Sequence, residues 1–162
     1  MATFKDRNGD TWTLDVHIGT LRTVKQRLNI DLLNVMGTNL LQELAGDPEN
    51  LVDVLYVLCS QQCDERGKSD MEFGRLLVGD AIEDAMNALV GALIDFFPKR
   101  QREMLRKIWT KVQAAESQQM TMLDRKLADT RMDQGINRLL AKSEQEIDRR
   151  LNALIGGDES TN

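Results

Sequence analysis

The chain has 162 residues, of which 41% are hydrophobic and 29% charged, and its net charge is −5. This composition is ordinary for a soluble globular protein and predicts one domain, or one domain with a helical appendage. No apolar run approaches the length of a membrane span, and the opening MATFKDRNGD has no apolar region typical of a secretory signal. We therefore expect a cytoplasmic protein in which Cys59 and Cys63 are reduced thiols.

The N-terminal residues predict a β-hairpin. An Asn8-Gly9 pair, in which both positions tolerate a positive φ, separates the runs 2–7 and 10–18. In the second run apolar and polar residues alternate, so one face is expected to lie on the helices. The apolar residues of this face are Trp12, Leu14, Val16 and Ile18, joined by Phe4. A two-stranded hairpin is marginal alone and must pack on something.

Short helices are expected next, one beginning at Gly19-Thr20 and one near residues 38–45. Asp47 as N-cap and Pro48 at the first helical position then begin a helix. Its sequence over residues 51–63 is LVDVLYVLCSQQC, which is apolar almost all round from Leu51 to Cys59 and predicts a central, buried helix. A strand is the rival interpretation because Val and Leu dominate, although the N-cap favours a helix. A capping box, Ser69-Asp70-Met71-Glu72, begins the next helix.

The stretch 76–98 carries the longest clean helical pattern. Asp80 is expected as its N-cap and Glu83 as the third helical residue of a capping box. Pro98 should stop the helix. Two stripes lie along it at helical spacing, and a neighbouring helix could approach the alanine stripe closely. The apolar stripe consists of Ile82, Met86, Leu89, Leu93, Phe96 and Phe97, and the alanine stripe of Ala81, Ala85, Ala88 and Ala92.

Charge divides the chain. Residues 1–98 carry −8, residues 99–112 carry +5 and residues 113–162 carry −2. We expect an acidic body over 1–98, a helical extension over 99–155 and a polar tail over 156–162. Asp133-Gln134-Gly135 should break the extension into two amphipathic helices, and Gly156-Gly157 should end the second one. The predicted fold class is mainly α: an N-terminal β-hairpin packed on a small helical bundle, followed by long amphipathic helices.

Candidate catalytic and metal-binding groups all have simpler interpretations. Cys59 and Cys63 could supply half of a zinc site, but His17 is the only histidine, so buried thiols are favoured. His17 is expected to face solvent from the hairpin, with no nucleophile in an identifiable motif near it. Carboxylates at residues 80, 83 and 84 could do acid–base work, but acids in a first helical turn also offset the helix dipole.

Two loops resemble ligand-binding motifs at a glance. Gly67-Lys68-Ser69 lacks the glycine five residues earlier that a phosphate-binding loop needs, and a loop followed by a helix cap explains it. The run 6–10 has its glycine at the wrong position for a calcium loop, and a hairpin turn explains it. We therefore expect no enzyme, cofactor or metal.

The extension holds the expected partner-binding residues. Its basic run could track nucleic-acid phosphates but has only Trp109 as an aromatic, so docking against a protein or a second copy is favoured and nucleic acid is unlikely. The residues predicted to contact a partner are Arg102, Leu105, Ile108, Trp109, Val112, Ile136, Leu140, Ile147 and Leu151.

The order of several segments resembles tail assembly chaperones of long-tailed bacteriophages and prophages. These segments are FKDRNGDTWTLDV, IDLL at 30–33, DPENLVDVLYVLC at 47–59, SDMEFGRLLVGDAIEDA at 69–85 and DFFPKRQREML at 95–105. The resemblance covers roughly two thirds of the chain.

The resemblance implies a non-enzymatic role in the cytoplasm of a host bacterium. Such chaperones bind the tape-measure protein and keep it soluble while the tail tube assembles, and many have a longer, frameshifted form. A structural tail or head–tail connector component is the alternative. A nucleic-acid-binding regulator that uses the basic run is a third possibility.

Overall fold

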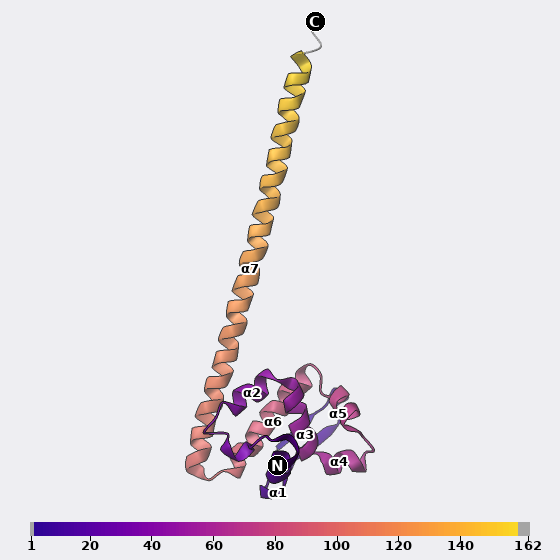
Figure 1. Ribbon diagram of the computed structural model, residues 1–162, viewed down its shortest axis with the longest axis vertical. Coiled ribbons are helices and arrows are strands. Elements are labelled where there is room, and N and C mark those ends of the chain that lie inside the picture. Colours follow the sequence, from indigo (N-terminus) through magenta and orange to yellow (C-terminus); the bar gives the residue numbers. More distant parts are fainter. Residues whose placement is uncertain (1, 159–162) are drawn as a thin grey trace. The chain divides into compact units, whose positions relative to one another are not determined.

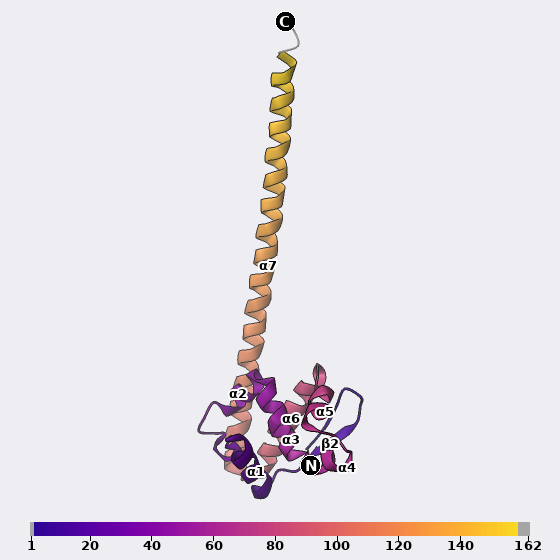
Figure 2. The same ribbon diagram turned by 45° about the vertical axis from the view of Figure 1, so that its right-hand side comes forward.

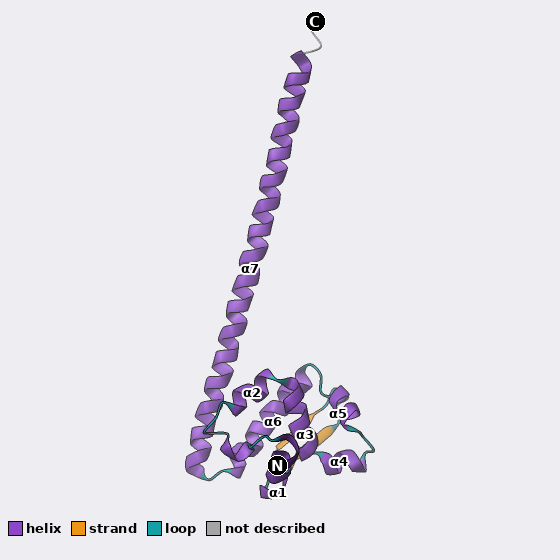
Figure 3. Cartoon of the chain, viewed as in Figure 1, coloured by secondary structure: helices purple, strands orange, loops and turns teal. Residues whose placement is uncertain are grey.

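The computed structural model describes residues 2–158, and these are mainly helical with one small sheet (Figures 1 and 3). The chain divides into two compact units, Met1–Gln113 and Ala114–Asn162, here called the body and the C-terminal unit. The predicted fold class, mainly α with an N-terminal hairpin, is confirmed. The elements are β1 (Ala2–Lys5), β2 (Thr11–Leu14), α1 (Ile18–Leu28), a 3-10 turn (Leu32–Asn34), α2 (Leu40–Gly46), α3 (Pro48–Leu58), α4 (Ser60–Glu65), α5 (Asp70–Leu76), α6 (Asp80–Phe96) and α7 (Lys99–Asp158).

The hairpin forms, but its turn differs from the predicted one. β1 and β2 are antiparallel, with Phe4 opposite Trp12. A five-residue loop joins them, and Gly9 alone of the Asn-Gly pair takes a positive φ, of 86°. Asp6 organises the loop because its carboxylate accepts hydrogen bonds from the backbone N–H groups of Asn8 (2.8 Å) and Asp10 (3.1 Å).

The second strand is shorter than the sequence predicts. It ends at Leu14, and Ile18, which was expected on the apolar strand face, begins α1 and is 49% exposed. His17 is exposed, as expected, but it is the N-cap of α1 rather than a strand residue, and its Nδ1 accepts from the Gly19 N–H at 3.0 Å. The N-cap and first turn of α1 thus occupy residues 17 and 18, which the alternating pattern assigns to the strand.

Strand β2 lies beside α4 (Figure 2). Side chains of α4 and of its C-cap residue, Arg66, cover the outer edge of β2. Gln62 Nε2 donates to the Thr13 carbonyl at 2.6 Å, and Gln62 Oε1 accepts from the Thr13 N–H at 3.0 Å. Arg66 Nη2 donates to the Thr11 carbonyl at 2.8 Å. These bonds satisfy backbone groups that an edge strand otherwise leaves unpaired.

The helix around residues 51–58 is central and buried, as the sequence predicts. Asp47 caps α3 by accepting from the Asn50 N–H at 3.2 Å, and Pro48 occupies its first turn. The buried residues of α3 are Leu51, Val54, Leu55, Val57 and Leu58. The chain bends at Cys59, so the predicted single helix over 51–63 is two helices, α3 and α4. The capping box of Ser69 and Glu72 begins α5 as expected.

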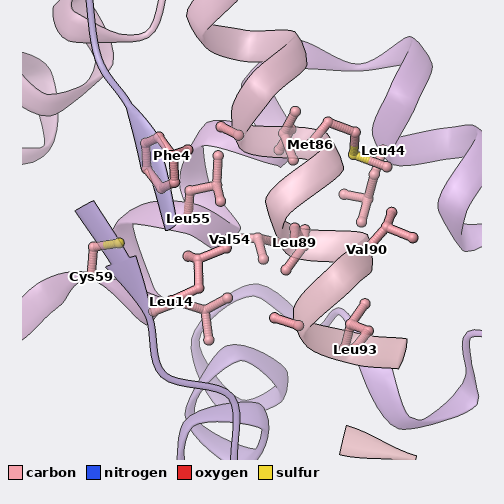
Figure 4. Packing of buried hydrophobic residues seen from close by; sticks show 14 of the residues in the cluster. Phe4, Leu14, Leu44, Val54, Leu55, Cys59, Met86, Leu89, Val90 and Leu93 are labelled. Carbon is pink, nitrogen blue, oxygen red and sulfur yellow. The ribbon is translucent and has the colours of Figure 1, made fainter. Parts of the chain in front are cut away.

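Helix α6 lies at the centre of the body's core. Met86, Leu89, Val90 and Leu93 of α6 meet Phe4 of β1, Leu14 of β2 and the buried face of α3 (Figure 4). Helix α6 packs on both strand β1 and helix α3, and Ala88 and Ala92 of its alanine stripe lie beside β1. A strand with Ala88 and Ala92 beside it can approach closely because these side chains are small.

The predicted cap of α6 is wrong. Gly79 is the N-cap, with φ 60° and ψ −132°, and Asp80 is the first helical residue, without a side-chain capping bond. Glycine reaches this backbone conformation without the steric cost of a Cβ. Asp80 and Glu83 still lie in the first turn, where their charge is favourable toward the helix dipole.

Pro98 forms the expected corner. Helix α6 ends at Phe96 and α7 begins at Lys99, with the Pro98 carbonyl accepting from the Arg102 N–H at 2.9 Å.

Two further predictions for α7 are wrong, because the helix runs unbroken through Asp133-Gln134-Gly135 and through Gly156-Gly157 to Asp158. A single glycine costs about 1 kcal/mol in a helix, which is too little to break a long one. The last four residues of the predicted tail lie outside the described residues.

Candidate protein-interaction surface

The first five predicted partner-binding residues belong to the body. Leu105 has 0% exposure and packs in the core, so it offers no surface to a partner. Ile108, Trp109 and Val112 are half-buried against the same core. Arg102 is half-buried, and its Nη2 donates to the Phe97 carbonyl at 3.4 Å. This packing explains why the body extends to Gln113, beyond the boundary at residue 98 expected from charge.

The other four predicted residues belong to the C-terminal unit and are exposed. Ile136, Leu140, Ile147 and Leu151 keep 51–57% of their surface accessible. They lie on one helix, so the structure brings them onto one face, at successive steps of four, seven and four residues. Every described side chain from residue 116 to 155 is exposed. The predicted site is therefore two sets of residues in different units, and only the second set is fully accessible.

The unbroken helix also reveals residues that sequence reasoning missed. Met120, Met122, Met132, Leu139 and Ile155 are 63–69% exposed. Leu154 was not among the predicted partner-binding residues, but it lies on the same face of α7 as the predicted four. We call Ile136, Leu140, Ile147, Leu151 and Leu154 the C-terminal stripe.

Leu123 and Leu127 lie on a different side of α7 from this stripe. At about 100° per residue, they are rotated by roughly 120° to 160° from its centre. Both are exposed, at 54% and 53%. They therefore form a separate apolar surface and serve below as matched controls.

Asp6, Trp12 and Arg66 form a cluster of side-chain interactions at the hairpin. Trp12 has 0% exposure, its Nε1 donates to Asp6 Oδ2 at 2.9 Å, and its ring meets Phe73 edge to face at 5.0 Å. The Arg66 guanidinium lies 4.1 Å from the centroid of the Trp12 ring, a cation–π contact. Because the Asp6 carboxylate already accepts three hydrogen bonds from the protein, the hairpin interpretation explains this loop better than a calcium site.

The pKa of Asp6 is lowered from its ordinary value of 3.8. Burial alone would raise the pKa, but the hydrogen bonds from Trp12, Asn8 and Asp10 and the charge of Arg66 together outweigh it. A carboxyl whose pKa is lower in the folded state stabilises the fold above its unfolded-state pKa. That contribution is lost as the pH falls through the folded-state pKa.

We expect Asp6→Asn to make the body less stable at neutral pH, and the difference from wild type to shrink in acid. An asparagine amide cannot ionise, so the variant lacks the stabilisation that the ionised Asp6 carboxylate gives. Wild type loses this stabilisation as the pH falls below the ordinary pKa of the carboxyl. Urea unfolding of both proteins from neutral pH down to about pH 2 measures this difference. A difference that stays constant across that range would show that the carboxylate charge contributes nothing.

The remaining candidate groups are the two cysteines and the carboxylates of α6. Cys59 and Cys63 are buried free thiols, and burial raises the pKa of Cys59 to about 12 and that of Cys63 to about 11. Each is thus a protonated, unreactive thiol at neutral pH. Within residues 2–158, no group of three or more His, Cys, Asp or Glu side chains is arranged to hold a metal ion. The carboxylates of Asp80, Glu83 and Asp84 are exposed.

None of the helices that the structure describes combines the length and the apolar character needed to cross a membrane. Comparison with protein-family models, with curated proteins and with solved structures finds no match to this chain. The feature of the chain that points to a function is the exposed apolar surface of α7.

Proposed function

We propose that this protein is a non-catalytic chaperone that binds an amphipathic helix of another protein through the C-terminal unit. The observation that carries the proposal is the C-terminal stripe, whose five apolar side chains are 51–73% exposed on one helix. An amphipathic helix recognises a partner through apolar side chains at such helical spacing. The body has a hydrophobic core of its own.

Two further features suit a chaperone. Three methionines of the C-terminal unit, Met120, Met122 and Met132, are 63–66% exposed, and flexible thioether side chains adapt to varied apolar partners. The net charge of −5 favours solubility of a complex that contains an apolar client.

The specific client that we propose is the tape-measure protein of a long-tailed phage, in the cytoplasm of a host bacterium. This choice rests on the resemblance of the sequence to tail assembly chaperones. A long helical client would offer many amphipathic segments to the C-terminal stripe.

Co-expression with the adjacent tape-measure protein tests this proposal. We expect wild type to raise the soluble fraction of the client and to co-purify with it. Changing Ile136, Leu140, Ile147 and Leu151 to serine should abolish both effects. The matched control changes four exposed apolar residues of the body to serine: Ile18, Leu33, Met71 and Val78. Client solubility that is unaffected by wild type, or equally lost in both variants, would contradict the proposal.

A structural tail or connector protein could use the same exposed surface. Mass spectrometry of purified particles separates the two roles. A chaperone is absent or scarce in particles, whereas a structural component is present in fixed copy number.

A further inference from the structure

The C-terminal stripe has a periodicity suited to pairing with a straight helix. Ile136, Leu140, Ser143, Ile147, Leu151 and Leu154 follow one another at steps of four, three, four, four and three residues. This pattern repeats every eleven residues over three turns, or 3.67 residues per turn, which is close to the natural period of an α-helix. The stripe therefore runs almost parallel to the helix axis for about 27 Å, since each residue rises 1.5 Å.

The charges beside the stripe differ between its two sides. One flank carries Glu144 and Asp148. The opposite flank carries both Arg150 and Glu146, which form an ion pair with Arg150 Nη2 at 3.1 Å from Glu146 Oε1, so this flank has no net charge. When two identical helices pair in parallel, opposite flanks meet, and when they pair antiparallel, equal flanks meet. An antiparallel pair would set the acidic flank with Glu144 and Asp148 against the same acidic flank of the other chain. A parallel pair places Arg150 of one chain beside the acidic flank of the other.

We propose that, in the absence of a client, the C-terminal stripe pairs with the same stripe of a second copy in a parallel dimer. In that arrangement each apolar residue meets its own copy at the same level, so the stripe is complementary to itself. The pairing also supplies packing for a helical segment whose side chains are all exposed, and most helical stability comes from such packing. The inference concerns the free protein and does not depend on the identity of the client.

The first test measures the mass of the full chain, without client, by sedimentation equilibrium over a range of concentrations. We expect a monomer–dimer equilibrium for wild type. The variant Leu140→Asp with Ile147→Asp should weaken dimerisation at least tenfold, because it buries charge at the centre of the stripe. The control, Leu123→Asp with Leu127→Asp, alters equally exposed residues on another side of α7 and should dimerise like wild type. A monomeric wild type, or equal weakening in both variants, would overturn the proposal.

The second test determines the orientation of the two chains. Leu154→Cys is at the end of the stripe, and the native thiols, Cys59 and Cys63, are buried. Under mild oxidation we expect this variant to form a disulfide-linked dimer with itself. A mixture with Ile136→Cys should form no cross-linked pair of the two variants. Preferential coupling of position 136 to position 154 would show an antiparallel pair and overturn the proposal. Because no client is present in either test, their outcome is separate from that of the chaperone assay.

Discussion

Trp12→Ala is expected to destabilise the body by about 3–5 kcal/mol, which is a large share of the roughly 5–15 kcal/mol typical of a small domain. The ring of Trp12 has no exposed surface and lies between Phe73 and the Arg66 guanidinium. Its removal leaves a cavity beneath the hairpin. It also takes the indole donor away from the buried carboxylate of Asp6, which adds the cost of an unsatisfied polar group.

Hydrogen exchange of the α3 and α6 amides during urea unfolding measures this loss, because it reports on the body alone. Trp109→Ala is the matched control. Trp109 is half-buried against the core, so its truncation should cost about 1 kcal/mol. Trp12→Phe should fall between the two, because it keeps much of the ring packing but loses the 2.9 Å bond to Asp6. Equal losses for the two alanine variants would show that the hairpin is not part of the cooperative core.

Features set by local chemistry were predictable from the sequence. The Asp47-Pro48 start of α3, the capping box of Ser69 and Glu72 and the corner at Pro98 each depend on residues within one helical turn. The chain needs no distant partner for these interactions. These helix starts and the corner can therefore be predicted from the sequence without a structure.

Features set by distant contacts were not predictable. The hairpin loop is tied to α5 because the Arg7 N–H donates to the Leu76 carbonyl at 3.0 Å, and the β2 edge is covered by Gln62, which lies 49 residues beyond Thr13. The break predicted at Gly135 overestimated the effect of one glycine in a long helix. The predicted partner-binding set also left out Leu154 and the exposed methionines of α7. The exposure of α7 could not be deduced either, because Leu105 and Leu140 have similar sequence surroundings but opposite burial.

Leu89→Ala is expected to lower the free energy of unfolding of the body by about 3–5 kcal/mol. Leu89 has 0% exposure at the middle of α6, among the apolar side chains of β1, β2 and α3 (Figure 4). Leucine and alanine are both strong helix formers, so the substitution leaves the propensity of α6 nearly unchanged. The loss thus measures packing, through the apolar surface removed and the cavity that remains.

Leu127→Ala makes the same chemical change on α7, where the side chain is 53% exposed, and should alter stability by less than about 0.5 kcal/mol. Hydrogen exchange of the α3 and α6 amides in urea again gives the free energy for the body. If Leu89→Ala destabilised α6 without affecting α3, the two helices would unfold independently, and the single core linking the hairpin to both of them would be wrong. If both helices lose protection together, α6 is the element through which the hairpin and α3 stabilise one another.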